Sequence, residues 1–114
     1  SHNDKWVALG DFNITSKEEK DLGIYSQINN DWYVSHLDGC KKCKGTFFYG
    51  QDGTWSFLDA IVFPKNKKMT LQTSYIYSNE INADIKDGKP RGFGILTGKG
   101  ISDHFPVVAE IQIN

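Results

Sequence analysis

Two short segments near opposite ends of the chain combine residue types that bind metal ions and phosphate esters. One contains Asp11 and Asn13, and the other contains Asp103 and His104. Each segment lies at the edge of an apolar run, where a strand would end. Because burying a carboxylate costs free energy unless it is paired or hydrogen-bonded, the fold alone gives no reason for acidic residues there. The four side chains therefore predict a site that holds a divalent metal and a phosphate ester.

The spacing within each segment indicates how its side chains would be used. Asp11 and Asn13 are two residues apart, so in an extended strand they would point to the same side. There the carboxylate would hold a cation or water, and the amide would donate to a phosphoryl oxygen. Asp103 and His104 are adjacent, so we expect them to diverge, one toward a metal or water and the other toward the substrate.

A fifth polar residue, Asp59, interrupts an apolar stretch that predicts a strand over 55–63. Its neighbours on one face of that strand would be aromatic or aliphatic: Trp55, Phe57, Ile61 and Phe63. A buried carboxylate needs a donor or a charged partner, and a reactive histidine needs an acceptor that orients its ring. We therefore expect Asp59 to hold His104. The simpler interpretation is that Asp59 caps local amides and that the other two segments are ordinary turns.

The elements before the middle of the chain follow from hydrophobic pattern and capping residues. A strand over 6–9, apolar on both faces, predicts a central strand buried between two layers. Ser16 is the expected N-cap of a helix that runs to about Ile28, with glutamates in its first turn. A short strand over 32–34 and a loop over 35–44 are expected to follow.

The second half of the chain reads mainly as strands. Strands over 46–49 and 55–63 flank a glycine-containing turn, which is a β-hairpin pattern. A strand is expected over 69–77, and apolar residues alternate with others over 107–113. The glycine-rich segment 79–102 has little regular pattern, and loops of this length are typical of functional or mobile regions.

Composition limits the class of protein. The chain has 114 residues, 39% of them hydrophobic, and a net charge of −1, which predicts one small globular domain. These values exclude a disordered tail and a polybasic module. No apolar run approaches the roughly 20 residues that span a bilayer. The cellular compartment stays open.

Cys40 and Cys43 form a closely spaced pair with lysines between and after them. The alternatives are a disulfide in a surface loop, two free thiols, or a metal site with His36 as third ligand and no obvious fourth. A redox motif is disfavoured, because a helix should open at its first cysteine, whereas residues 45–49 indicate a strand. We interpret the pair as structural.

Three widely separated motifs now stand in order: Leu9-Gly10-Asp11-Phe12-Asn13, Phe57-Leu58-Asp59-Ala60-Ile61 and Gly100-Ile101-Ser102-Asp103-His104-Phe105-Pro106-Val107. Together they resemble the endonuclease/exonuclease/phosphatase superfamily, whose fold is deoxyribonuclease I-like, and the resemblance covers essentially the whole chain. It implies an α+β fold, part of a four-layer α/β/β/α sandwich with mainly antiparallel sheets, and one domain over 1–114.

The resemblance also implies a metal-assisted attack of water on a phosphate ester, with Mg²⁺, Mn²⁺ or Ca²⁺ as the cofactor. Asp11 would orient or deprotonate the water and help bind the metal, with Asp103 on the metal side. Asn13 would bind a phosphate oxygen. His104, held by Asp59, would contact the phosphate and stabilise charge in the transition state.

Family members are longer, and all three motifs belong to the second half of their domain. The first half supplies an Asn and a metal-binding Glu, and nothing before Trp6 matches them. We therefore expect this chain to be the C-terminal half, to lack activity alone, and to need the N-terminal half. Sheet edges left exposed would favour self-association.

The resemblance does not choose the substrate, because this fold serves many phosphate esters. Residues 40–63 are similar to bacterial members described as endonucleases or exonucleases, so a nuclease or phosphodiesterase is expected. A net charge of −1 offers no broad basic face for DNA. Alternatives are a phosphomonoesterase acting on lipid or inositol phosphates, a sphingomyelinase, and a noncatalytic binding module that recognises its partner through 79–102.

Overall fold

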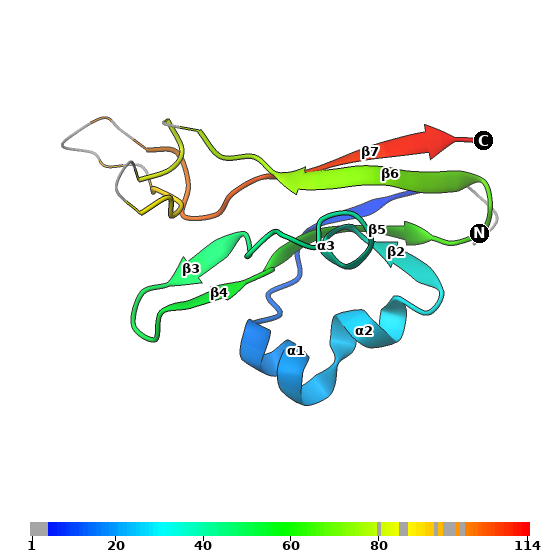
Figure 1. Ribbon diagram of the computed structural model, residues 1–114, viewed down its shortest axis with the longest axis horizontal. Helices are drawn as coiled ribbons and strands as arrows, with labels where there is room; N and C mark the ends of the chain where they lie inside the picture. Colours follow the sequence, from blue (N-terminus) through cyan, green and yellow to red (C-terminus); the bar gives the residue numbers. More distant parts are fainter. Residues whose placement is uncertain (1–4, 80, 85–86, 93, 95–97, 99) are drawn as a thin grey trace.

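The fold consists of short helices and antiparallel strands (Figure 1). The computed structural model describes residues 5–79, 81–84, 87–92, 94, 98 and 100–114. Its elements are β1 (Ala8–Asp11), α1 (Ser16–Leu22), α2 (Ile24–Ile28), β2 (Trp32–Val34), α3 (Ser35–Asp38), β3 (Phe47–Tyr49), β4 (Thr54–Ser56), β5 (Asp59–Pro64), β6 (Met69–Ile76) and β7 (Val107–Ile113). All pairings between these strands are antiparallel, which confirms the α+β class.

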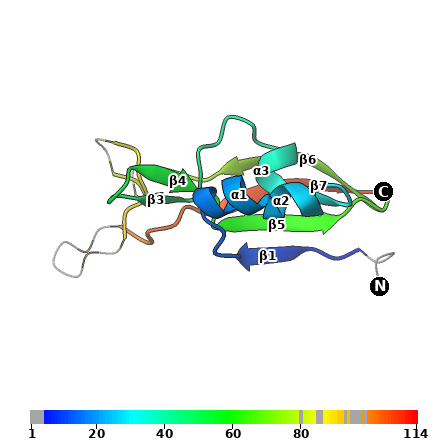
Figure 2. The same cartoon turned by 90° about the horizontal axis from the view of Figure 1, so that it is seen from below.

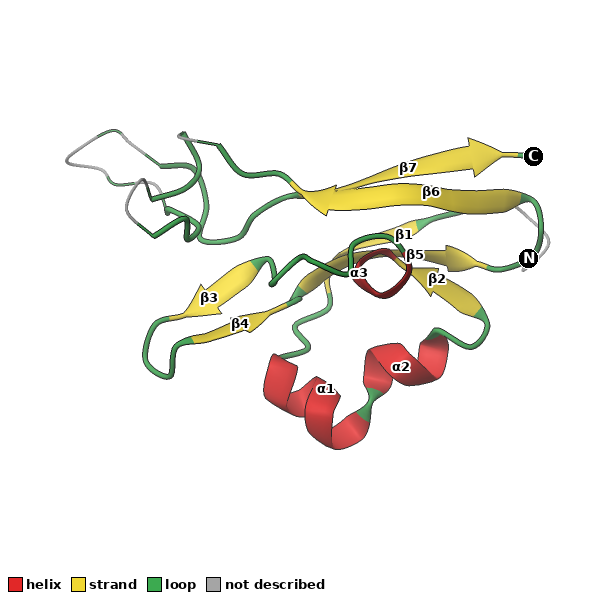
Figure 3. Cartoon of the chain, in the orientation of Figure 1, coloured by secondary structure: helices red, strands yellow, loops and turns green. Residues whose placement is uncertain are grey.

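The strands form three groups around β5. In the largest, β5 lies between β1 and β2; β3 pairs with β4, and β6 pairs with β7. The β6–β7 pair lies on one side of the β1-β5-β2 sheet, and α1 and α2 lie on the other, as Figures 1 and 2 show. The hairpin of β3 and β4 extends beyond the end of the sheet where β5 begins (Figure 3).

The first strand differs from its prediction in both position and burial. It spans Ala8–Asp11 rather than 6–9, and it is an edge strand of the three-stranded sheet. Leu9 is 71% exposed, so the expectation of a strand buried on both faces is wrong. An apolar run in the sequence shows that a strand could be buried on both faces. Whether it is buried depends on which other elements pack against it.

The predicted helix is two helices. Thr15, not Ser16, is the N-cap of α1, and Gly23 ends that helix with a φ of 61°. This left-handed conformation suits glycine, because it has no β-carbon to clash with the backbone. The Glu19 carboxylate then accepts the Tyr25 N–H at 2.7 Å at the start of α2. None of the described helices is long and apolar enough to cross a membrane.

The predicted strand over 55–63 is interrupted. β4 ends at Ser56, β5 begins at Asp59, and the two strands pair with different partners. The most buried positions include Leu58 and Ala60, whereas Asp59 is only half-buried. The break therefore places Asp59 at a strand start rather than in the middle of a buried aromatic row. The predicted loop over 35–44 also differs, because it begins with the short helix α3.

A small core supports the start of β5 from the helical side. Tyr25, Val34, Ala60 and Val62 form its buried cluster. The Tyr25 hydroxyl donates to the Phe57 carbonyl at 2.7 Å, and burial raises the pKa of this phenol. This bond fixes the backbone two residues before Asp59.

The glycine-rich segment 79–102 lies partly outside the described residues. Its described part contains two isolated bridges, Ala83 with Pro90 and Gly92 with Ile101. The backbone of Gly100, with a φ of 84°, passes so close to residues 91 and 92 that a β-carbon would clash with their carbonyls. This close passage holds the start of the segment that carries Asp103 and His104 against residues 91 and 92.

Candidate functional site

The register of β1 and β5 brings two predicted carboxylates together. Asp11 is the last residue of β1, Asp59 is the first residue of β5, and the two are direct partners across the antiparallel pair. Opposite residues in such a pair have α-carbons about 4.5–5.5 Å apart. The end of the first strand therefore meets the start of the fifth, and both carboxylates lie at one sheet end.

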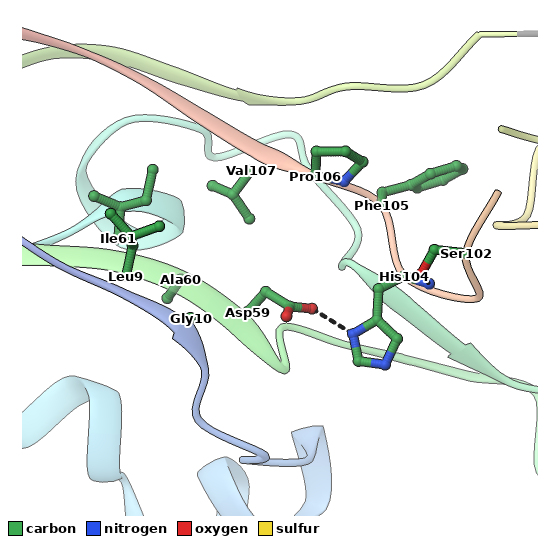
Figure 4. Close-up of a pocket in the computed structure, with 10 residues that line it drawn as sticks. All are labelled: Leu9, Gly10, Asp59, Ala60, Ile61, Ser102, His104, Phe105, Pro106 and Val107. Carbon is green, nitrogen blue, oxygen red and sulfur yellow. Dashed lines mark hydrogen bonds and ion pairs between the residues drawn. The ribbon is translucent and has the colours of Figure 1, made fainter.

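His104 completes this cluster from the far end of the chain. Its Nδ1 lies 2.7 Å from Oδ2 of Asp59, so the predicted contact is present (Figure 4). The two side chains are 25% and 23% exposed, respectively, which leaves the pair partly shielded but open to solvent. The ring of Phe47 contacts the imidazole, with centroids 5.1 Å apart.

Thr46 fixes the backbone on both sides of this pair and was missed by the sequence reasoning. Its hydroxyl accepts the Asp59 N–H at 3.2 Å, and its carbonyl accepts the Phe105 N–H at 2.8 Å. The residue is fully buried. No motif marks it, and only its place at the start of a predicted strand, directly after Gly45, hints at a constraint. A β-carbon on Gly45 would lie 2.6 Å from the Ser56 carbonyl oxygen.

Asp103 lies beside His104 rather than diverging from it. Its Oδ1 is 3.8 Å from Nε2 of His104, and both residues line the same groove. We expected the two side chains to diverge, one toward a metal or water and the other toward the substrate. That divergence is not observed. The imidazole stands between two carboxylates, with Asp59 on Nδ1 and Asp103 near Nε2.

Asn13 lies after the strand end, in a turn. Its φ is 56°, and its N–H donates to Oδ1 of Asp11 at 2.8 Å. The extended geometry that would have aligned the two side chains stops at Asp11, so the simpler interpretation as an Asx turn is correct for this segment. Both residues nevertheless line the groove beside His104.

The site opens onto a groove of about 850 Å³ between α1 and the β3–β4 hairpin. It contains four of the five predicted site residues together with residues from α1 and the hairpin: Asp11, Asn13, Thr15, Ser16, Lys17, Lys20, Phe47, Tyr49, Asp52, Thr54, Ser56, Leu58, Asp103 and His104. A second hollow of about 370 Å³ is shared by Asp59 and His104 and is otherwise mostly apolar (Figure 4). The Asp59–His104 pair thus lies between a polar groove and an apolar hollow.

Three residues are placed so that they could hold a metal ion. Donor atoms of Asp11, Asp59 and His104 all lie within 4.8 Å of one another. The predicted metal ligands were Asp11 and Asp103. In the structure, the residues whose donor atoms lie near Asp11 in this set are Asp59 and His104. Carboxylate oxygens suit Mg²⁺ or Ca²⁺, and three protein donors would leave several positions for water or a substrate oxygen.

The cysteines and His36 belong to a different region. Cys40 and Cys43 form a disulfide with α-carbons 5.5 Å apart, which favours the disulfide among the predicted alternatives. His36 stacks on Phe57 with centroids 4.1 Å apart, and its Nδ1 is buried without a hydrogen-bond partner among the described residues. Burial lowers the pKa of His36 to about 4, although the nearby charges of Glu19 and Asp38 oppose the shift.

No protein-family model, curated protein or solved structure matches this chain. A function must therefore be argued from the geometry of the groove and from the motifs that the chain carries.

Proposed function

We propose that this chain carries the hydrolytic site of a divalent-metal-dependent phosphoesterase, and that its substrate is a phosphodiester. One observation carries the proposal: His104 is hydrogen-bonded to Asp59 at the mouth of a groove that also presents Asp11, Asn13 and Asp103. Strand ends from distant parts of the sequence converge there. A packed core needs no such convergence of carboxylates.

The bond to Asp59 defines what His104 does. An ionised carboxylate only accepts hydrogen bonds, so the 2.7 Å contact requires a proton on Nδ1. Nε2 is then the atom that faces the groove, near Asp103. There it contacts a phosphoryl oxygen, and a protonated ring stabilises the negative charge that develops in the transition state.

The remaining residues position the reactants. Asp11 orients the attacking water and accepts its proton, and Asn13 donates its side-chain amide to a phosphate oxygen. Mg²⁺, or Mn²⁺ or Ca²⁺ in its place, would be held by Asp11, with Asp103 on the metal side as the motif resemblance implies. The donor atoms of Asp59 and His104 also lie within 4.8 Å of Asp11, but in this proposal these two residues serve the imidazole–carboxylate hydrogen bond. When bound, such an ion would supply positive charge to neutralise the phosphoryl oxygens. The oxygen-rich donor set of the groove fits such a hard cation.

We further propose that the chain forms one half of a four-layer α/β/β/α sandwich, as its motif resemblance implies. The other half would supply an Asn and a metal-binding Glu, so the 114-residue chain by itself would be inactive. The exposed edge strand β1 supports this proposal, and so does the apolar hollow beside Asp59, because both are surfaces that another strand or another copy would cover.

The test compares the 114-residue chain with the longest protein that its gene encodes. Both are assayed with Mg²⁺, Mn²⁺ or Ca²⁺ on bis(p-nitrophenyl) phosphate, plasmid DNA, a phospholipid and an inositol phosphate. We expect the gene-encoded protein to cleave the diesters, EDTA to abolish cleavage, and the 114-residue chain to be inactive. If only the inositol phosphate were cleaved, the proposed substrate would be a phosphomonoester and not a phosphodiester. Failure to cleave any of these esters would contradict the proposal.

A further inference from the structure

Tyr25 carries a buried hydroxyl that the proposed chemistry does not use. Its side chain belongs to the core cluster at the start of β5 and is 2% exposed. The ring alone would fill this space, so packing does not explain the hydroxyl. A buried hydroxyl costs free energy unless it is hydrogen-bonded, and this one donates to the Phe57 carbonyl at 2.7 Å. Phe57 and Leu58 form the crossover that joins the end of β4 to the start of β5.

The second peptide group of this crossover is held on both sides by distant parts of the chain. Its carbonyl, from Leu58, accepts the Phe12 N–H at 2.7 Å and the Asn13 N–H at 3.3 Å. Its N–H, from Asp59, donates to the Thr46 hydroxyl at 3.2 Å. The turn after β1 and the backbone of the residue that holds His104 are therefore attached to one peptide group.

The first peptide group of the crossover is held from the helical side. The Tyr25 hydroxyl bonds its carbonyl, and the Phe57 ring stacks on His36 with centroids 4.1 Å apart. The His36 ring in turn meets the Tyr25 ring edge-on, with centroids 4.5 Å apart. Adjacent peptide groups are rigid planes that share one α-carbon, so turning the first plane displaces the second. The hydroxyl therefore limits where the Asp59 carboxylate can lie.

The place of Tyr25 is itself fixed at the start of α2. The Glu19 carboxylate, from α1, accepts the Tyr25 N–H at 2.7 Å and the Ser26 N–H at 3.1 Å. It also accepts the Ser26 hydroxyl at 2.9 Å. The phenol thus reaches the crossover from a helix start that is tied to the preceding helix.

We propose that Tyr25 is a positioning residue for the Asp59–His104 pair. It lines neither the groove nor the apolar hollow, so it acts through the crossover and not on the substrate. The inference rests on the proposed phosphoesterase function and adds to it a residue outside the groove that orients the reactive imidazole.

The main test is Tyr25→Phe in the longest protein that the gene encodes, with bis(p-nitrophenyl) phosphate as the substrate. We expect kcat to fall by roughly 10- to 100-fold, because a small displacement of a reactive group has an effect of that size. A double-mutant cycle with Asp59→Ala shows whether the loss passes through Asp59. The loss in Tyr25→Phe/Asp59→Ala should be clearly smaller than the product of the two single losses.

A second measurement does not depend on hydrolysis. In EDTA and at about pH 8, where the ring is neutral, the ¹⁵N chemical shifts of His104 report which nitrogen carries the proton. We expect the Nδ1–H form in the wild type, because an ionised carboxylate only accepts hydrogen bonds. Tyr25→Phe should raise the share of the Nε2–H form, and Asp59→Ala should raise it further.

Two controls separate positioning from loss of stability. Tyr33→Phe removes a hydroxyl from a tyrosine that contacts Phe63 at the other end of β5. Phe63→Leu opens a cavity at that fully buried position and destabilises the fold there. Neither control should change kcat or the His104 tautomer. Circular dichroism and thermal unfolding verify that each variant is folded.

Glu19→Ala provides an independent variant in case Tyr25→Phe does not fold. It keeps the phenol but removes the carboxylate that holds the start of α2. We expect a smaller loss of kcat and a smaller shift of the His104 tautomer, both in the same direction as in Tyr25→Phe.

Several outcomes would overturn the inference. These are a folded Tyr25→Phe with wild-type kcat and tautomer, equal losses in Tyr25→Phe and Phe63→Leu, or losses that multiply fully in the double variant. If Tyr25→Phe does not fold, wild-type kcat and tautomer in Glu19→Ala would also overturn it. A tautomer shift in a protein that hydrolyses no ester would support the inference and overturn the proposed function alone. Hydrolysis that is unchanged in Tyr25→Phe would overturn only the inference.

Discussion

His104 and His36 are two imidazoles in aromatic surroundings, yet their environments are opposite. His104 contacts Phe47, holds Asp59 at 2.7 Å through Nδ1, and borders the groove. His36 stacks on Phe57, and its Nδ1 is buried without a hydrogen-bond partner among the described residues. The aromatic neighbour is common to both histidines, so it does not distinguish them. The carboxylate partner and access to solvent are what His104 has and His36 lacks, and our proposal assigns reactivity to His104 on that ground.

The difference has a direct electrostatic consequence for His36. Removing an imidazole from water disfavours its charged form, so the pKa of His36 falls to about 4 and the ring is neutral at pH 7. Such a ring behaves as a flat core side chain between Phe57 and Tyr25. The contrast between the two histidines leads to three experiments, in order of decreasing expected effect.

The largest effect is expected at the groove. His104→Ala in the gene-encoded protein should lower the rate of diester hydrolysis by roughly 100- to 1000-fold, as for loss of a transition-state donor. Asp59→Asn should also lower it, because the ring loses the carboxylate that orients it. The unfolding free energy of either variant should change by about 1 kcal/mol or less.

Steady-state kinetics and urea unfolding make both measurements on the same preparations. Asp21→Asn, an exposed position in α1, is the matched control for the loss of one carboxylate. Full activity of His104→Ala in a folded protein would remove the distinction drawn between the two histidines.

A smaller effect is expected from His36 as the pH falls. The folded-state pKa of about 4 lies below the ordinary value of 6.5, so the unfolded chain takes up a proton first. The stability present above pH 6.5 should therefore be lost between pH 6.5 and about 4, by up to about 1.4 kcal/mol for each pH unit. His36→Phe keeps a flat ring and should remove this part of the pH dependence.

Urea unfolding at pH 7, 5.5 and 4.5 for the wild type and His36→Phe measures the difference. Activity at pH 7 should be retained in the variant, because His36 lies outside the groove. Parallel pH profiles for the two proteins would show that His36 is not buried as a neutral ring.

The smallest effect concerns Thr46, which joins the backbone on both sides of the His104–Asp59 pair. Thr46→Val removes the hydroxyl that accepts the Asp59 N–H, and we expect a loss of about 1 kcal/mol of unfolding free energy. Activity should also fall, by less than in His104→Ala. Thr73→Val in β6 is the matched control. If Thr46→Val and Thr73→Val changed activity equally, Thr46 would have no specific role in positioning the His104–Asp59 pair.

Local patterns in the sequence predicted several elements well. The short strand at 32–34, the hairpin and the strands near 69–77 and 107–113 were all predicted, because alternation and turn residues act over a few neighbours. The helix near 16–28 was predicted as one element and is two, since the αL conformation of Gly23 ends the first helix. A glycine can lie within a helix or end one, so the presence of Gly23 in the sequence does not show that the helix breaks there.

The contact between Asp59 and His104 was predicted through a chemical need rather than through a pattern. An acidic residue in an apolar stretch requires a partner, and His104 requires an acceptor, so the pairing with Asp59 could be inferred across 45 residues. The contribution of Thr46 could not, because a threonine is common at a strand end. The position of Asp103 near Nε2 was also not predicted, since turn geometry overrides the alternation expected of adjacent residues.

The sequence by itself determined which groups are available: three acidic residues, an amide and a histidine, placed at the edges of apolar runs or within one. Only the tertiary structure decided that Asp103 lies beside the His104 ring, that β1 is an exposed edge, and that α1 and the β3–β4 hairpin enclose one groove. The reason is physical. Propensity and capping act between near neighbours, whereas strand register and backbone hydrogen bonds between distant residues set distances that no local pattern contains.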